Sequence, residues 1–378
     1  LLLCFLFLAP ARGLSVLAQQ ASNATISGHV FDGVTGDPIE DVNVFIAGTF
    51  LGSATDSAGF YLIKEVAPGD HDLVVAMAGY EPQELQLQIL QPVAYIYDFR
   101  LKPKVYLAPE IEISASKPTG WQKDLDVFKK LFLGDSHNAQ KCKLVNPEVL
   151  DFYHDDVRVL FFANAEHMLE IENRALGYRV NFLLEKFVAQ GQKVVFLGKT
   201  RFDELEPKND KERNRWRRNR RRTYNGSMRH FLKILATGGG DMSRAGFKIM
   251  HTPDLLSDAE SLELQEVEPS TLISPGRMEY ERQLRFSGYL QITYEREKES
   301  KAFIYWRDRQ NPALVNKTRQ DLLASARPGK QTSWLKLNRR SVTIDTSGHL
   351  YDPMAVTTYG YWAWERVAEL LPLEYRPR

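Results

Sequence analysis

Two groups of residues in this 378-residue chain have types and spacings that could do chemistry. The first is His167 followed three positions later by Glu170, which is the spacing of a zinc-ligand pair. With eight histidines in the chain, one such match is nearly expected by chance. The surrounding residues are predicted to form a strand, in which positions i and i+3 point to opposite faces. His167 and Glu170 are therefore weak metal candidates, and His230, His251 or His349 would have to supply a third ligand.

The second group is a run of cations between residues 211 and 222, where eight of twelve residues are Lys or Arg. On a helix these charges repel one another unless anions lie nearby. One interpretation is a solvated helix neutralised within the fold, for which the acidic stretch 254–268 is a candidate partner. The other interpretation is a site for lipid phosphates or acidic polysaccharide. The residues assigned to this anion-binding site are Arg215, Arg217, Arg218, Arg220, Arg221 and Arg222.

Other catalytic patterns fail on their surroundings. The Gly-Lys-Thr triplet at 198–200 has the ending of a phosphate-binding loop, but Lys193 stands where the first glycine should be. The Ser-x-x-Lys spacings that begin at Ser114 and Ser333 fall in a linker and a predicted strand, and no Lys-Thr-Gly accompanies them. We therefore assign no catalytic residue and no cofactor, and favour a protein that is not an enzyme.

The composition, 43% hydrophobic and 26% charged, is that of a soluble globular protein with room for two or three domains. Residues 1–18 begin with an apolar block and end in Val16-Leu17-Ala18, which indicates a signal peptide with a truncated start. The block is shorter than the ~20 residues that a membrane span needs. Arg12 leaves with this peptide, so 48 basic and 48 acidic residues remain and no net charge favours nucleic acid. Cys142 is then alone, which excludes an internal disulfide.

Residues 24–102 have the pattern of a small antiparallel β-sandwich, because short runs of Val, Ile, Phe and Tyr are separated by turns. We expect strands at 25–31, 42–47, 59–66, 71–77, 85–90 and 94–101, with a short one near 51–55. These can close a seven-stranded sandwich. The residues assigned to structural turns are Gly36, Pro38, Asp56, Gly59, Gly69 and Gly79, of which Gly36 and Gly59 are free to take a positive φ.

This segment resembles the carboxypeptidase regulatory-like domain, a transthyretin-type (prealbumin-like) β-sandwich common in exported proteins of Bacteroidota. The likeness rests on three blocks in order, which span residues 28–39, 55–61 and 68–80. The resemblance implies a module that is itself non-catalytic. It also supplies the alternative function, a zinc-dependent, carboxypeptidase-like peptidase using His167 and Glu170. In such peptidases, however, the module follows the catalytic domain, whereas here it comes first.

Residues 103–120 are expected to be a linker, and residues 121–378 an α+β domain with a large antiparallel sheet, so that the chain is mainly β. An amphipathic helix is predicted at 121–133 and a closing helix at 359–371. The expected strands are 157–163, 168–171, 177–188, 193–202, 246–250, 285–294, 302–306, 334–337 and 341–344. Segments around residues 167–178, 215–216, 226–231 and 360–362 resemble uncharacterised Bacteroidota envelope proteins, which supply no known activity.

Together these features favour a non-enzymatic cell-envelope protein that is exported and periplasmic or associated with the outer membrane. The sandwich would be a binding or docking module, with an envelope protein or polysaccharide as the expected partner. Binding to an anionic membrane surface through the arginine run stays an alternative, as does the zinc peptidase. Nucleic acid is not expected as a partner.

Overall fold

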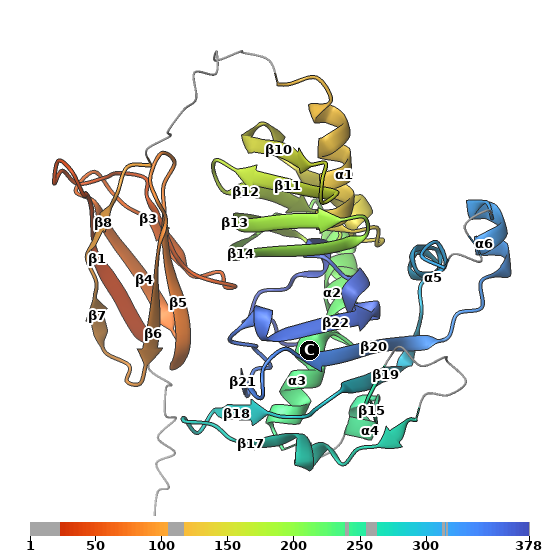
Figure 1. The fold of residues 1–378 in the computed structure, drawn as a ribbon. Coiled ribbons are helices and arrows are strands. Elements are labelled where there is room, and N and C mark those ends of the chain that lie inside the picture. Colours follow the sequence, from red (N-terminus) through yellow and green to blue (C-terminus); the bar gives the residue numbers. More distant parts are fainter. Residues whose placement is uncertain are drawn as a thin grey trace, which may run out of the picture.

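The computed structural model of this protein describes residues 23–104, 117–238, 242–254, 263–311, 314 and 317–377. Their structure is mainly β, as the sequence predicts. Figure 1 shows an N-terminal β-sandwich, in red and orange, standing beside a larger C-terminal region that is built on several antiparallel sheets.

The sandwich consists of two four-stranded sheets. One contains β4 (Phe60–Val66), β1 (Ala24–Asp32), β7 (Ala94–Ile96) and β8 (Phe99–Leu101); the other has the order β3 (Gly52–Ala54), β2 (Asn43–Ile46), β5 (Gly69–Ala76), β6 (Gln83–Ile89). The segments β7 and β8 run parallel to successive parts of β1, so the expected strand 94–101 is present in two pieces. Alternate residues of β1 are buried, which places Ile26 and Val30 in the core between the sheets.

A six-stranded antiparallel sheet begins the C-terminal region. Its strands are β9 (Cys142–Leu144), β10 (Leu150–Asp155), β11 (Leu160–Ala165), β12 (Leu169–Asn173), β13 (Tyr178–Gln190) and β14 (Lys193–Glu204), with short 3-10 turns at Ala139–Lys141 and Pro147–Val149. The predicted helix is present as α1 (Trp121–Leu133). It buries Leu125, Phe128 and Phe132 against this sheet, in agreement with its 3.6-residue apolar period.

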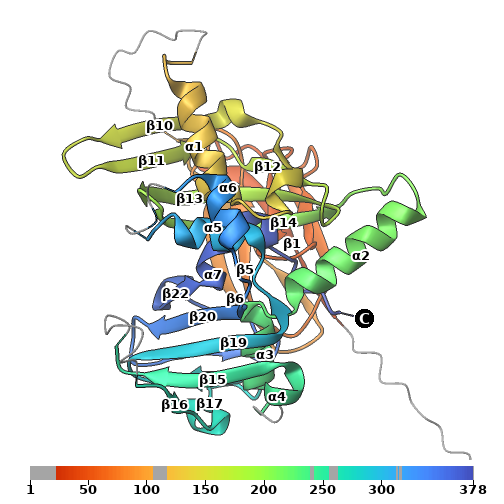
Figure 2. The ribbon, with the colours of Figure 1, turned by 90° about the vertical axis from the view of Figure 1, so that its right-hand side faces the viewer.

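The rest of the region contains a five-stranded and a three-stranded antiparallel sheet. The larger has the order β16 (Gln265–Glu266), β15 (Phe247–Thr252), β19 (Tyr289–Lys298), β20 (Lys330–Leu337), β22 (Val356–Gly360), and the smaller has β17 (Ile273–Pro275), β18 (Glu281–Leu284), β21 (Val342–Asp345). The helices are α2 (Asp210–Tyr224), α3 (Met228–Ala236), α4 (Met242–Ala245), α5 (Lys301–Asp308), α6 (Arg319–Ser325) and α7 (Tyr361–Trp364), with 3-10 turns at Pro269–Leu272, Pro353–Ala355 and Val367–Glu369. Figure 2 shows α2, in green, projecting to one side of the sheets.

Two of the predicted secondary-structure elements were wrong. Residues 302–306 form part of helix α5 and not a strand, because Ser300 caps a helix whose adjacent residues Phe303 and Ile304 are both buried. The closing helix 359–371 is also absent over most of its length. Tyr359 pairs with Trp334 in the ladder between β20 and β22, and α7 ends after one turn, at Trp364. Pairing with a strand distant in sequence overrides the local helical pattern here.

The sandwich contacts the C-terminal region through the turn between β2 and β3. The amide of Gly48 donates a hydrogen bond to the carbonyl of Thr200 (2.6 Å), and the amide of Phe202 donates to the carbonyl of Thr49 (2.9 Å). The ring of Phe50 then lies 5.6 Å, centroid to centroid, from the ring of Tyr178. The turn is therefore joined to β14 by backbone hydrogen bonds and to β13 of the same sheet by an aromatic contact.

Polar contacts extend this interface along the sheet of β2, β5 and β6. The ammonium of Lys199 in β14 lies 2.8 Å from a carboxylate oxygen of Asp72 and 2.6 Å from one of Glu84. The hydroxyl of Tyr280 donates to Asp70 at 2.9 Å, as does that of Tyr351. Opposite charges and hydrogen bonds at several points thus fix the orientation of the sandwich.

Candidate functional site

The basic run predicted from the sequence forms helix α2. Its first turn is capped by the side chain of Asn209, which accepts a hydrogen bond from the amide of Glu212 at 3.0 Å. Asp210 and Glu212 lie in the first turn, and Arg221 and Arg222 lie in the last. This order of charges complements the helix dipole and helps a segment with so many cations to remain helical.

One side of α2 is fixed to the turn between β12 and β13. Trp216 is only 3% exposed, and its indole N–H donates to the carbonyl of Arg174 at 2.9 Å. The amide group of Asn219 donates to the carbonyl of Ala175 at 2.8 Å. These contacts determine which side of α2 faces solvent.

Arg220 belongs to this anchored side. Its guanidinium donates to the carbonyl of Leu176 (2.7 Å) and pairs with Glu204 (2.8 Å). It also lies 3.9 Å from the centre of the Tyr178 ring, in a cation–π contact. With its donors used inside the fold, Arg220 holds α2 onto β13 and is a structural residue.

Two more of the six predicted arginines are paired with carboxylates. Arg215 lies 2.8 Å from Glu212 one turn earlier on the helix, and Arg222 lies 3.4 Å from Glu297 of β19. Both guanidiniums are exposed, so each pair adds little stability, but each cation is partly neutralised.

The remaining three arginines, Arg217, Arg218 and Arg221, are exposed. Within the part of the chain that the structure describes, no carboxylate forms an ion pair with any of them. The six predicted residues therefore divide equally into three that are paired with acidic groups and three that are available to an external anion.

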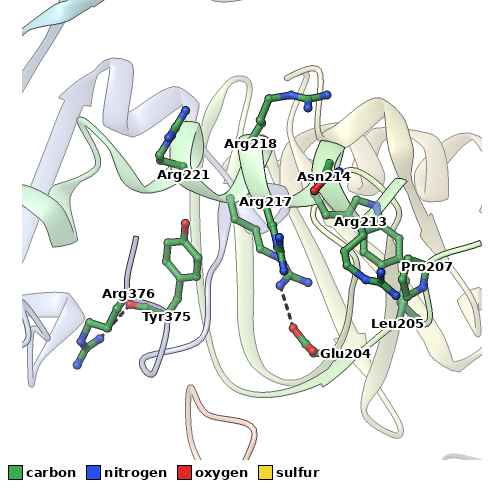
Figure 3. Close-up of a pocket in the computed structure, with 12 residues that line it drawn as sticks. Glu204, Leu205, Pro207, Arg213, Asn214, Arg217, Arg218, Arg221, Tyr375 and Arg376 are labelled. Carbon is green, nitrogen blue, oxygen red and sulfur yellow. Dashed lines mark hydrogen bonds and ion pairs between the residues drawn. The ribbon is translucent and has the colours of Figure 1, made fainter. Parts of the chain in front are cut away.

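These three arginines line a pocket of about 910 Å³ between α2, the segment after β14 and the C-terminal segment. We call it the arginine pocket; its lining residues are Glu204, Leu205, Pro207, Arg213, Asn214, Trp216, Arg217, Arg218, Arg220, Arg221, Tyr375 and Arg376. Figure 3 shows the arginines spread along α2, with Tyr375 and Arg376 toward one end and Leu205, Pro207 and Arg213 toward the other.

The C-terminal contribution to this pocket was missed by sequence reasoning. Arg376 donates to the carbonyls of Leu373 and Tyr375, so its charge is held in place without a carboxylate. Burial raises the pKa of the Tyr375 phenol, which therefore stays neutral at physiological pH and can donate a hydrogen bond. Nothing in the sequence places these two residues beside a helix about 150 positions earlier.

The acidic stretch 254–268 is not seen as the partner of this helix. Residues 255–262 lie outside the described residues. The carboxylates that pair with α2 in the described structure belong to α2 itself, to Glu204 and to Glu297.

The weak metal candidates lie apart from this pocket, at the start of β12. His167 is exposed just before the strand, and Glu170 is half-buried within it. Among the residues that the structure describes, no group of three or more His, Cys, Asp or Glu side chains is placed to hold a metal ion. Burial raises the pKa of the Cys142 thiol to about 12, so this cysteine is protonated at neutral pH.

Five of the six predicted turn residues lie in the connections of the sandwich, and Gly69 is the first residue of β5. Asp56 accepts hydrogen bonds from the amides of Ala58 and Phe60, both at 2.9 Å. Pro38 forms an isolated bridge with Phe31. The four glycines Gly36, Gly59, Gly69 and Gly79 all have positive φ.

Comparison with known families identifies the N-terminal part. Residues 26–113 match the family model of the CarboxypepD_reg-like domain, which confirms the resemblance drawn from the sequence. This match covers less than a quarter of the chain. No curated protein matches the chain.

Three solved structures show weak likenesses to this chain. A type II cohesin–X-dockerin complex of Acetivibrio cellulolyticus has a chain with 20% identity and a TM-score of 0.19, over 31% of this chain and 80% of that one. A candidate carbohydrate binding protein of Bacteroides uniformis has 12% identity and a TM-score of 0.19, over 43% of this chain and 60% of that one. A candidate membrane-associated protein of unknown function from Bacteroides fragilis has 13% identity and a TM-score of 0.17, over 43% of this chain and 65% of that one. With scores this low, these likenesses support no argument about function.

None of the helices in the described residues has both the length and the apolar character that a membrane crossing requires.

Proposed function

We propose that this protein is a non-enzymatic binding protein whose arginine pocket takes an acidic oligosaccharide. The observation that supports the proposal is that Arg217, Arg218, Arg221 and Arg376 all line one pocket, and that these four cations have no carboxylate partner among the described residues. Guanidinium groups present paired N–H donors that fit the oxygens of carboxylates, sulfates and phosphates.

The arrangement suits a ligand with several anionic groups better than a single small anion. Arg217 and Arg221 are one helical turn apart, which separates their attachment points by about 6 Å along the axis. The pocket volume of about 910 Å³ lies near the upper end of the usual range for sites that enclose an organic ligand. A chain with acidic groups at intervals could contact these cations in succession.

The apolar parts of the lining favour an oligosaccharide over a lipid bilayer. Leu205, Pro207 and Tyr375 contribute carbon-rich surface beside the cations. Sugar rings pack against such surface through their C–H faces, whereas a bilayer surface is met by residues that protrude. Binding to anionic membranes is therefore the outcome that would replace this proposal, not the one that we favour.

Isothermal titration of the full chain tests the proposal, with oligogalacturonate and a heparin-derived hexasaccharide as probes. The triple variant Arg217→Gln, Arg218→Gln, Arg221→Gln should weaken binding at least about tenfold, because charge-assisted hydrogen bonds contribute about 1.5–3 kcal/mol each. The matched control changes Lys211, Arg215 and Arg222 to Gln, which removes the same charge from the same helix outside the pocket lining. This control should stay within about threefold of the parent chain.

Three results would contradict the proposal. Equal losses of affinity in the two triple variants would show that the ligand is attracted by the net charge of the helix and does not bind in a defined pocket. Failure of the parent chain to bind either oligosaccharide would reject an acidic oligosaccharide as the ligand. Binding to phosphatidylglycerol vesicles without binding to the oligosaccharides would assign the arginines to a membrane surface.

We also propose that the protein works in the cell envelope, in the periplasm or at the outer membrane. The support is the apolar N-terminal segment with its cleavage pattern before Gln19, which lies outside the described residues. N-terminal sequencing of the native protein tests this idea. A mature chain that starts at Gln19 agrees with it, whereas an intact segment 1–18 on protein from the cytoplasmic fraction contradicts it.

A further inference from the structure

The C-terminal segment that forms one wall of the arginine pocket is held by the N-terminal sandwich. The amide of Leu373 donates to the carbonyl of Gly48 at 2.8 Å. In the same turn, the amide of Phe50 donates to a carboxylate oxygen of Glu374 at 2.9 Å. Gly48 has a φ of 77°, and a Cβ there would lie 3.1 Å from Cδ1 of Leu373, so the turn and the segment are in close contact.

A second anchor explains why this segment has one defined position. The guanidinium of Arg229 in α3 donates to the carbonyls of Pro372 (2.7 Å) and Leu373 (2.5 Å), and also to that of Tyr375 (3.0 Å). The segment is thus clamped between α3 and the sandwich just before Tyr375 and Arg376 enter the pocket. An arginine with three carbonyl acceptors holds the backbone in one conformation.

The same sandwich turn reaches the other walls of the pocket. Gly48 and Thr49 are hydrogen-bonded to β14, whose last residue, Glu204, lines the pocket. Phe50 packs on Tyr178, and the guanidinium of Arg220 in α2 lies over that same ring. The C-terminal segment and β14 therefore touch the β2–β3 turn directly, and α2 touches it through Tyr178.

We infer that the docked sandwich regulates the arginine pocket, so that ligand binding and sandwich docking are thermodynamically coupled. The inference rests on the proposed function, because it concerns the same site. If docking of the sandwich positions Tyr375 and Arg376, displacement of the β2–β3 turn must lower the affinity for the ligand. By linkage, a bound ligand must then stabilise the docked sandwich. A CarboxypepD_reg-like domain would then act here as an internal support for a binding site in the neighbouring region.

A matched pair of glycine substitutions in the full chain tests this coupling. Gly48→Ala and Gly79→Ala place the same side chain at nearly the same φ, 77° and 78°. Only the first meets a neighbour, since nothing lies within 4 Å of a Cβ at Gly79. We expect Gly48→Ala to lower the affinity for the heparin-derived hexasaccharide by about fivefold or more. Gly79→Ala should leave this affinity within about twofold of that of the parent chain.

Glu374→Gln gives an independent test without backbone strain. Removing a negative charge next to the pocket would by itself strengthen the binding of an anion. The coupling predicts the opposite result, because the amide of Phe50 loses its charged acceptor and the segment loosens. Weaker binding in Glu374→Gln, with faster hydrogen exchange in residues 370–377, therefore supports positioning by the sandwich.

The outcomes separate this inference from the proposed function. Unchanged binding in the Arg217, Arg218, Arg221 triple variant would show that the arginine pocket is not the binding site, and would reject the proposed function. Loss of binding in that triple variant, together with parent-like affinity in both Gly48→Ala and Glu374→Gln, overturns the coupling alone. If Gly48→Ala fails to fold, Glu374→Gln decides the question: tighter or equal binding overturns the inference.

Discussion

The indole ring of Trp216 lies directly against the backbone of Gly177, where a Cβ atom would come within 2.2 Å of the ring carbons Cδ2 and Cε3. Gly177 also has a φ of 72°, which side chains other than glycine rarely adopt. The helix that carries the arginines can approach the β12–β13 turn this closely only because the turn has glycine there. The position of the arginine pocket thus depends on one residue without a side chain.

Gly177→Ala should destabilise the protein by about 3 kcal/mol or more, because it combines an unfavourable φ with a clash against a buried ring. Gly191→Ala is the control, since Gly191 has a φ of 59° and nothing within 4 Å of a Cβ. We expect it to cost about 1 kcal/mol. Urea unfolding of both variants measures the difference, and equal costs would refute the role assigned to the Trp216 contact.

Binding of the acidic oligosaccharides should depend strongly on salt. Raising the NaCl concentration from about 0.05 to about 0.5 M shortens the range of charge attraction to below the pocket dimensions. We expect the affinity to fall by about tenfold or more over this range, and to fall less in the triple variant of Arg217, Arg218 and Arg221. Titrations at four salt concentrations give the slope; parallel slopes would mean that these arginines do not carry the attraction.

His230 should make the fold sensitive to acid. Its ring lies among Tyr224, Phe247 and Tyr294, and its Nδ1 accepts a hydrogen bond from the amide of Gly226. Burial, with Lys233 and Arg296 nearby, lowers the pKa of this imidazole from 6.5 to about 4. The fold therefore favours the neutral ring, so its contribution is complete above pH 6.5 and is lost as the pH falls toward 4.

The loss should amount to about 2–3 kcal/mol between those two pH values. His230→Gln keeps a hydrogen-bond acceptor for the amide of Gly226 but cannot titrate. Its unfolding free energy should therefore change less between pH 6.5 and 4 than that of the parent chain. An identical pH profile for the two proteins would assign the acid sensitivity to other groups.

Glu365 should have the opposite pH dependence. Burial, with the charges of Glu369 and Glu297 nearby, raises the pKa of its carboxyl well above 4.5. The folded state favours the neutral acid, so stability is complete below pH 4.5 and decreases as the pH rises through the raised value. Glu365→Gln should raise the unfolding free energy at pH 7 by about 1 kcal/mol and leave it unchanged at pH 4. A lower melting temperature at pH 7 would contradict this expectation.

Lys199 should matter more for docking than an ordinary surface lysine. Lys199→Met leaves Asp72 and Glu84 without their shared cation, and we expect a loss of about 2 kcal/mol. Lys193→Met in the same strand is the control, because Lys193 is exposed and should change stability by less than about 0.5 kcal/mol. Thermal unfolding compares the two; similar small effects would show that this ion pair contributes little to the interface.

Local sequence was sufficient where one pattern decided the structure. The turns and apolar alternation of residues 24–102 predicted the sandwich, and the spacing of Leu125, Phe128 and Phe132 predicted α1. The hairpin of β13 and β14 followed from two long strand patterns around residues 189–192. In each case the residues that define the element are close in sequence, so their periodicity reports the burial directly.

The candidate site could be predicted only as a run of charge. The sequence placed eight cations on one segment but could not tell which of them have partners. Arg220 donates a hydrogen bond to the carbonyl of Leu176 and forms an ion pair with Glu204. Arg222 forms an ion pair with Glu297, some 75 positions away. Only the packing of α2 against the sheets determines which of these cations are paired with carboxylates and which are not.

The closing residues show the same limit. Their aromatic spacing fits a helix, but pairing of Tyr359 with Trp334 keeps the chain extended before α7. The sequence by itself therefore determined the class of the N-terminal domain and the presence of a strongly basic segment. The tertiary structure decided that Arg217, Arg218 and Arg221 line one pocket together with Arg376. The physical reason is that hydrogen bonds between segments distant in sequence, which no local periodicity reports, hold the C-terminal segment at this pocket.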